Sequence, residues 1–249
     1  MIQLLINGVS GQMGQALLRA AQDANDFAVV GGVDPLGGDR PFPVFSSAAE
    51  IDVDFDIAID FSVASAVGPV LDYCVKNGKP IVIATTGLSE ETMAAVAAAA
   101  KTIPVFHSGN FSLGVNLQLA LCRLAATTLG ADAEVEIIET HHNKKLDAPS
   151  GTAWMLANEI TTVLPDRYEV LDRSTERKRR DLSEIGIHAV RGGSVVGEHE
   201  VKFFYGDEII TVKHQAFSKS VFAVGALRAA KWLSGKGPGL YTMRELLDG

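Results

Sequence analysis

Cysteine is scarce in this chain of 249 residues, which contains only Cys74 and Cys122. Two thiols so far apart in sequence do not make a disulfide framework or a thiolate metal site, so we expect both to be buried and free. The chain also lacks an apolar run of the roughly 20 residues that span a bilayer, which argues against a membrane protein. It shows neither a basic leader nor a small-residue cleavage site, and we expect it to be cytoplasmic.

Positive charge is in short supply as well. The chain has 22 basic and 30 acidic residues, giving a formal net charge of -8. Because phosphate binding needs a surplus of lysine and arginine on one face, nucleic acid is not an expected partner. The basic segment 173–180 is an exception, but no aromatic residue interleaves it, and we predict a solvated loop there.

The first hundred residues alternate short β-rich apolar runs with helical patterns, as βαβ units do. Met13, Ala16, Leu17 and Ala20 give the first helix one apolar face. The expected strands are 3–6, 28–33, 57–60, 81–84 and 105–106. This half is predicted to be of the α/β class, with a Rossmann-like, doubly wound parallel sheet.

The pattern changes after about residue 110. A helix over 115–129 and a strand over 134–141 are followed by a helix that begins at Gly151. Two further strands, 200–205 and 209–214, flank a Gly-Asp pair that suits a two-residue hairpin, so we predict antiparallel pairing. Between these parts, the sequence gives no assignment for residues 165–187.

These patterns predict two domains. Residues 1–109 and about 219–249, which include a C-terminal helix, are expected to form a dinucleotide-binding domain. Residues 110–218 are expected to form a smaller α+β domain, with a mixed or antiparallel sheet, that binds substrate and makes the oligomer.

A glycine-rich turn directly follows the first strand and opens the first helix. Glycines there let the backbone approach a pyrophosphate, and the helix start favours an anion. The spacing departs by one residue from GxGxxG, and a plain strand-to-helix turn is the alternative. The candidate cofactor contacts of this turn are Gly8, Val9, Ser10, Gly11, Gln12 and Met13.

Asp34 ends the second strand, 20 residues beyond Gly14, where a carboxylate can accept hydrogen bonds from a ribose. An Asp-Pro turn is the alternative interpretation. Because Pro35 supplies no cation to offset a 2′-phosphate, we expect NADH to be preferred over NADPH, although Arg40 stands in the following loop.

Two later strand ends carry small and polar residues where an open parallel sheet meets its ligand. They are candidate nicotinamide contacts, although ordinary loop chemistry explains each equally well. The residues are Ala84, Thr85, Thr86, Ser108, Gly109, Asn110 and Phe111.

Residues 139–153 concentrate groups that transfer protons. His141 and His142 end a strand, two lysines follow, and a Pro-Ser-Gly-Thr run starts a helix. Adjacent strand residues point to opposite faces, so both histidines serve one site only if the strand has ended. We expect no metal, because HExxH and cysteine patterns are missing and the lysines would repel a cation.

Ser150 is well placed to cap this helix, leaving the N-H groups of Gly151 and Thr152 pointing outward. A purely structural cap is the alternative. Beside His142 and Lys145, however, the same helix start becomes a positive pocket in an acidic protein, which suggests a small carboxylate substrate. We therefore expect Ser150, Gly151 and Thr152 to bind substrate.

The stretch E-x-H-H-x-x-K-x-D-A-P-S-G-T-A at 139–153 resembles the signature of the 4-hydroxy-tetrahydrodipicolinate reductase (dihydrodipicolinate reductase) family. The resemblance extends to Gly8–Gly14, Asp60-Phe61-Ser62, Thr85-Thr86-Gly87, Asn110-Phe111-Ser112 and Gly237–Tyr241. It implies the nicotinamide-dependent reduction of the dihydrodipicolinate ring system to tetrahydrodipicolinate in lysine (diaminopimelate) biosynthesis. The partner is then a small dicarboxylate substrate, and the assembly a homotetramer.

The same resemblance implies a role for individual residues. His141 becomes the general acid/base and Lys145 the proton donor, while His142, Gly151 and Thr152 contact the substrate carboxylate. Two alternatives remain at this point. One is another two-domain dehydrogenase acting on amino acids or sugars, and the other is a dinucleotide sensor without catalysis, in which His141 or Lys145 would be replaced.

Overall fold

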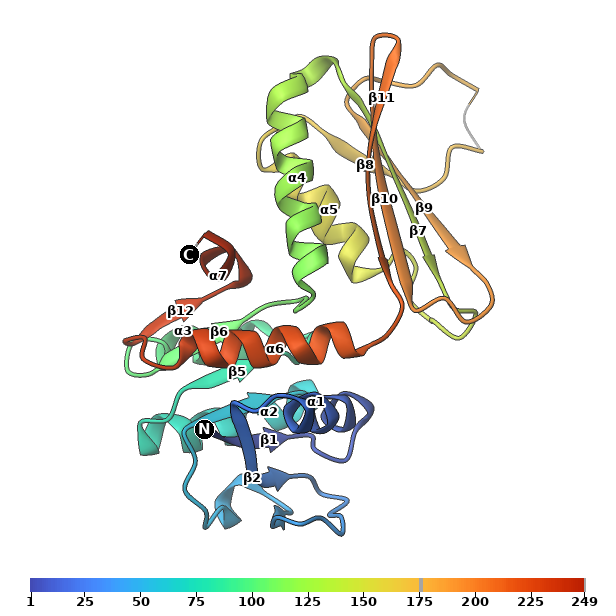
Figure 1. Cartoon of the computed structure of the whole chain (residues 1–249). Helices are drawn as coiled ribbons and strands as arrows, with labels where there is room; N and C mark the ends of the chain where they lie inside the picture. The colour runs from blue at the N-terminus through green and yellow to red at the C-terminus, as the bar shows by residue number, and fades with distance from the viewer. Residues whose placement is uncertain (175–176, 249) are drawn as a thin grey trace. The chain divides into compact units, whose positions relative to one another are not determined.

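The computed structural model of the chain describes residues 1–174 and 177–248. The chain folds into two compact units, one of Met1–Leu113 with Lys219–Gly249 and one of Gly114–Ser218 (Figure 1). In the described part of the chain, no helix combines the length and apolarity that crossing a bilayer requires.

In the described residues of the first unit, seven parallel strands form one sheet in the order β12-β6-β5-β4-β1-β2-β3. The strands are β1 (Ile2–Asn7), β2 (Phe27–Val33), β3 (Val44–Phe45), β4 (Ile57–Asp60), β5 (Ile81–Ile83), β6 (Pro104–His107) and β12 (Gly239–Tyr241). All five strands expected from the sequence are present, which confirms the parallel α/β prediction. The sequence does not predict β3 and β12, because β3 has only two residues and β12 begins within the Gly-Pro-Gly run at 237–239.

Helices cover both faces of this sheet. They are α1 (Gln12–Asp23), α2 (Ala64–Asn77), α3 (Glu90–Ala99), α6 (Ser220–Leu233) and α7 (Met243–Asp248), with a 3-10 turn at Ala48–Glu50. Alternate strand residues serve the two faces: Leu4 and Ile6 pack in the cluster with α1 and α6, whereas Leu5 packs in the cluster with α2 and α3. Strands buried on both faces explain the nearly continuous apolar runs of this half.

In the second unit, described strands form a mixed sheet in the order β11-β10-β7-β9-β8. The elements are α4 (Leu113–Leu129), a 3-10 turn (Gly130–Asp132), β7 (Glu134–His141), α5 (Gly151–Thr161), β8 (Tyr168–Val170), β9 (Glu184–Arg191), β10 (Gly197–Tyr205) and β11 (Glu208–Ala216). β10 and β11 pair antiparallel across the two-residue turn, as predicted, whereas β7, β9 and β8 run parallel. Helices α4 and α5 cover one face of the sheet (Figure 1).

The basic segment is only partly described, because Thr175 and Glu176 lie outside the described residues. The prediction of a solvated loop is wrong for Arg180, which donates to Glu136 Oε1 at 3.0 Å and to the carbonyl oxygen of Val135 at 2.8 Å. Arg173 pairs with Glu184 on β9. The paired carboxylates come from strands that sequence alone does not align with this segment.

Both cysteines are buried free thiols, as expected. Burial raises the pKa of Cys74 and of Cys122 to about 12. Neither thiol is a nucleophile at neutral pH.

Candidate active site

The glycine-rich turn between β1 and α1 is tight enough to require glycine at two positions. Gly8 has φ +79, and a Cβ there would lie 2.5 Å from the carbonyl oxygen of Phe61. A Cβ at Gly14 would lie 2.2 Å from the carbonyl oxygen of Gly8. The start of α1 has no side-chain cap and no acidic residue in its first turn, so its N-H groups and dipole favour an anion.

Asp34 ties this turn to the loop after β2. Its buried carboxylate accepts from the Ser10 N-H at 2.9 Å and from the Leu36 N-H at 3.0 Å. Ser10 Oγ in turn donates to the carbonyl oxygen of Gly37 at 2.7 Å. Each carboxylate oxygen keeps acceptor capacity, so this site fits a ribose hydroxyl beside a pyrophosphate.

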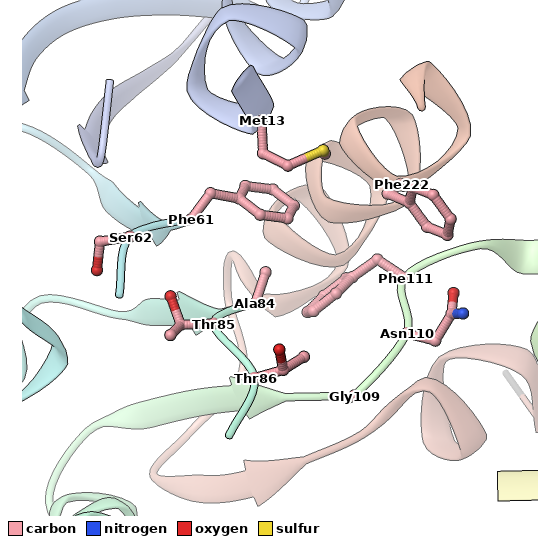
Figure 2. Close-up of a pocket in the computed structure, with 10 residues that line it drawn as sticks. All are labelled: Met13, Phe61, Ser62, Ala84, Thr85, Thr86, Gly109, Asn110, Phe111 and Phe222. Atoms are coloured by element: carbon pink, nitrogen blue, oxygen red, sulfur yellow. The ribbon is translucent and has the colours of Figure 1, made fainter. Parts of the chain in front are cut away.

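A cavity of about 330 Å³ opens beyond the carboxyl ends of β4, β5 and β6. It is lined by Met13, Phe61, Ser62, Ala84, Thr85, Thr86, Gly109, Asn110, Phe111 and Phe222. Figure 2 shows Met13, Phe61 and Phe222 around one side of it, and Thr85 and Thr86 around the other. Aromatic walls edged by hydroxyl and amide groups fit a nicotinamide ring and its carboxamide.

Seven of the expected cofactor residues thus line one cavity: Met13, Ala84, Thr85, Thr86, Gly109, Asn110 and Phe111. Ser108 does not line it, because its hydroxyl is engaged with the backbone of Asn110. Val9 is fully buried in the core, so it offers only backbone atoms. Gln12 accepts from Lys219 Nζ at 3.0 Å.

Asp60 lies beneath this cavity and is fully buried. Its Oδ1 accepts from Thr85 Oγ1 at 3.2 Å, from the Ser62 N-H at 2.9 Å and from Asn7 Nδ2 at 3.2 Å. Burial raises the pKa of this carboxyl. Asp60 therefore holds two lining loops, a role that its place after an apolar strand does not reveal.

A second cluster lies in the second unit, at the end of β7. Strand alternation places Glu139 and His141 on the same, buried face. His141 Nδ1 lies 2.6 Å from Glu139 Oε2. Burial lowers the pKa of His141, and the Glu139 carboxylate opposes that effect.

Arg191 at the end of β9 completes this pair. Its two terminal nitrogens donate to the two oxygens of Glu139, each at 2.7 Å. Burial acts to raise the pKa of Glu139, but hydrogen bonds from Arg191, His141 and the Ser150 backbone outweigh it, and the net direction is downward. The carboxylate is thus ionised and accepts only, so the proton of a neutral His141 must sit on Nδ1.

The start of α5 joins the same cluster. The Ser150 N-H donates to Glu139 Oε1 at 3.0 Å, and Ser150 Oγ caps the helix by accepting from the Ala153 N-H at 3.2 Å. The hydroxyl of Ser150 is buried and also shares a hydrogen bond of 2.8 Å with His199 Nε2. Gly151, at the first helical position, is exposed.

His199 on β10 packs edge-on against His141, with ring centroids 5.1 Å apart. Burial and the neighbouring His141 lower the pKa of His199 to about 3, so it is neutral. Sequence reasoning missed Arg191 and His199 because they reach the cluster from strands that pair with β7 far along the chain.

His142 and Lys145 follow in the loop after β7. The strand ends at His141, which frees His142 from strand alternation. The His142 N-H donates to the carbonyl oxygen of Val195 at 2.8 Å, and its Nδ1 is buried without a partner among the described residues. Lys145 Nζ pairs with Asp147 Oδ1 at 2.8 Å.

A glycine-rich turn and a cavity at the carboxyl edge of a parallel sheet, with buried histidines on a second unit, are typical of a two-domain nicotinamide-dependent oxidoreductase. Family comparison narrows this class. The model "Dihydrodipicolinate reductase, N-terminus" matches residues 2–111, and "Dihydrodipicolinate reductase, C-terminus" matches residues 114–247. The chain belongs to the dihydrodipicolinate reductase family.

Individual relatives agree over the full length. A 4-hydroxy-tetrahydrodipicolinate reductase of Caldanaerobacter subterraneus subsp. tengcongensis is 48% identical, with 99% of this chain and 98% of that protein covered. One from Clostridium botulinum is 40% identical at the same coverage. The solved structure of a dipicolinate-bound dihydrodipicolinate reductase from Paenisporosarcina sp. TG-14 has a TM-score of 0.82 at 25% identity, covering 97% of each chain.

Proposed function

We propose that the chain catalyses the reaction named for these relatives, in which a reduced nicotinamide cofactor converts the dihydrodipicolinate ring system to tetrahydrodipicolinate for lysine (diaminopimelate) synthesis. The observation that carries this proposal is the joining of His141 to the start of α5 through one buried carboxylate, Glu139. This arrangement supports the proposal, because a histidine able to transfer protons lies next to a helix start that suits a carboxylate.

The second unit performs the proton chemistry in this proposal. The exposed N-H of Gly151, with Thr152 and the side chain of His142, binds a substrate carboxylate, as the helix dipole favours. His141 acts as the general acid/base through Nε2, and Lys145 Nζ donates a proton. Ser150 contributes by shaping the helix start, since its hydroxyl is already engaged.

The first unit holds the cofactor. Gly8–Met13 and Asp34 hold the pyrophosphate and ribose, and the cavity lined by Thr85, Asn110 and Phe111 receives the ring. When bound, the reduced nicotinamide supplies the hydride. One hydride and one proton add across the conjugated ring, and the Lys145 ammonium stabilises the electron density that moves away from the carbon that accepts the hydride.

We further propose NADH as the preferred cofactor, because the Asp34 carboxylate disfavours a 2′-phosphate and Pro35 supplies no cation. Arg40 is the group that limits this preference. A Cβ at Gly38 would lie 3.6 Å from Arg40 Nε and 3.7 Å from Ser10 Oγ, so Arg40 lies beside the loop. NADPH used as well as NADH in a steady-state comparison would overturn this preference.

The test of the function is the oxidation of NADH, followed by absorbance, while dihydrodipicolinate synthase forms the unstable substrate from pyruvate and aspartate semialdehyde. We expect oxidation that depends on both proteins. Tight NADH binding without oxidation would point instead to a different dehydrogenase or a sensor. Homotetrameric assembly remains a prediction from the family resemblance, and a cytoplasmic location remains a prediction from the sequence.

A further inference from the structure

The Glu139 carboxylate is fully buried and accepts four hydrogen bonds. Oε2 accepts from His141 Nδ1 and from one terminal nitrogen of Arg191, at 2.6 and 2.7 Å. Oε1 accepts from the Ser150 N-H and from the other Arg191 nitrogen, at 3.0 and 2.7 Å. Each of these groups donates its hydrogen bond, and each carboxylate oxygen accepts two of the four.

This pattern requires an ionised carboxylate and not merely a polar side chain. A glutamine at residue 139 has one oxygen and one NH2 group, so one pair of donors would face another donor. If the NH2 group faced His141, the ring would have to move its proton to Nε2 to accept at Nδ1. If it faced Ser150, the start of α5 would lose its anchor.

The four hydrogen bonds join three elements of the second unit. Glu139 and His141 lie on β7, Arg191 ends β9, and Ser150 begins α5. His199 on β10 closes the cluster from the other side, through Ser150 Oγ and the His141 ring. Burying a charged group costs free energy unless the group is fully paired. The complete set of hydrogen bonds around Glu139 therefore indicates that the positions of its partners are important.

We propose that Glu139, clamped by Arg191, is a positioning residue for the reaction: it keeps the proton of His141 on Nδ1, leaves Nε2 for the substrate, and fixes the α5 start that receives the substrate carboxylate. The inference rests on the proposed function, in which His141 is the acid/base. Glu139 itself is buried and touches no substrate. One group thus sets both the proton-transferring atom and the anion-binding backbone.

The first experiment needs no catalysis. In the wild-type protein labelled with 15N-histidine, NMR correlations between ring nitrogens and carbon-bound protons report which nitrogen carries the proton. The His141 signal is assigned as the one missing from a His141→Gln variant. We expect the Nδ1-H tautomer with a slowly exchanging ring proton, and an Nε2-H tautomer would overturn the proposal without any variant of Glu139.

The second experiment compares Glu139→Gln with Glu136→Gln. Glu136 is a matched control, because it lies on the same strand and pairs with Arg180 but faces away from His141. In Glu139→Gln we expect kcat to fall about 100-fold, within the range that a positioned acid/base contributes. We also expect either the Nε2-H tautomer of His141 or, by calorimetry, at least fivefold weaker binding of dipicolinate, with NADH affinity unchanged.

Glu136→Gln should keep the wild-type kcat and dipicolinate affinity. A Glu139→Gln protein with wild-type kcat, tautomer and dipicolinate affinity would overturn the proposal. If the wild-type protein does not turn over the dihydrodipicolinate system, the proposed function fails, whereas the tautomer and dipicolinate measurements still decide whether Glu139 positions His141 and α5. The two failures are therefore distinguishable.

Discussion

The backbone of Gly197 lies against the ring of His141, so that a Cβ at residue 197 would come within 3.1 Å of Nε2. That nitrogen is the atom proposed to exchange protons with the substrate. Because Glu139 holds the opposite side of the ring, a methyl group at residue 197 should displace Nε2 by a few tenths of an ångström. We expect Gly197→Ala to lower kcat about tenfold in the coupled assay, less than the roughly hundredfold loss that a 1 Å misplacement causes.

Gly192→Ala is the control for this substitution. Gly192 lies in the connection from β9 to β10, five residues before Gly197, which begins β10, but a Cβ there would meet no atom within 4 Å. We expect wild-type kcat for this variant. Equal losses in the two variants would mean that the connection between the strands, and not the space beside His141, limits the rate.

Lys145→Ala should remove the proposed proton donor of the second unit. Its ammonium lies 2.8 Å from Asp147, so the loop also loses an exposed ion pair, which contributes little to stability. We expect kcat to fall by about 100- to 1000-fold while the dissociation constant for NADH, measured by calorimetry, stays unchanged. Weakened NADH binding would contradict the assignment of Lys145 to the substrate half.

Asp34→Ala should have the reverse effect. It removes the acceptor for the Ser10 and Leu36 N-H groups and the proposed acceptor for the cofactor ribose. We expect the KM for NADH to rise about tenfold, which corresponds to about 1.4 kcal/mol of binding free energy, with kcat at saturating NADH close to wild type. If Asp34→Ala and Lys145→Ala gave the same kinetic pattern, the division of roles between the two units would be wrong.

His199 should make the protein less stable in mild acid. Its pKa is lowered from 6.5 to about 3 by burial, so the unfolded chain takes up a proton below pH 6.5 that the folded chain refuses. The contribution of the neutral His199 to the free energy of unfolding is therefore fully present above pH 6.5 and is lost as the pH falls towards 3. The loss is about 2 kcal/mol between pH 6.5 and 5. Urea unfolding at these two pH values should show a smaller loss of stability in His199→Gln than in wild type, and an equal loss would contradict the prediction.

Asp60 should make the protein less stable as the pH rises, which is the opposite of the effect of His199. Burial raises its pKa above the ordinary 3.8, so the folded chain holds a proton that the unfolded chain has released. The contribution of Asp60 to the free energy of unfolding is fully present below pH 3.8, and it is lost as the pH rises through the pKa that Asp60 has in the folded state. In urea unfolding from pH 4 to pH 7, Asp60→Asn should gain stability relative to wild type as the pH rises. A constant difference between Asp60→Asn and wild type across this range would contradict the prediction.

The sequence predicted those parts of the fold that depend on local pattern. β7 and the hairpin of β10 and β11 are long enough to show alternation or a turn, and their predicted positions are confirmed. The sequence does not predict β8 and β9, because the pairing of these strands depends on residues distant in the chain and not on neighbouring residues. The same reason hides Arg191, which sits opposite His141 only because β9 pairs with β7 in parallel.

The candidate site residues also fall into two groups, those that the local sequence reveals and those that it does not. The sequence identifies the stretch around His141 because its groups are adjacent in the chain. It does not identify the roles of Gly197, Asp60 or His199, since a small residue in a strand, an aspartate at the end of a strand and a buried histidine each have ordinary structural explanations. Their relevance appears only when distances across the sheets are known.

The first unit is built from two separate segments of the chain, which leaves the unit at Leu113 and returns to it at Lys219. Helix α6, which packs on β4, β5 and β6 through Ala223, Ala226 and Leu233, is therefore synthesised more than one hundred residues after those strands. Helix α1 already packs on this face, so during translation it is the area that α6 covers that stays open until the second unit has been synthesised. We expect the nascent first half to expose this apolar area until its last helix arrives.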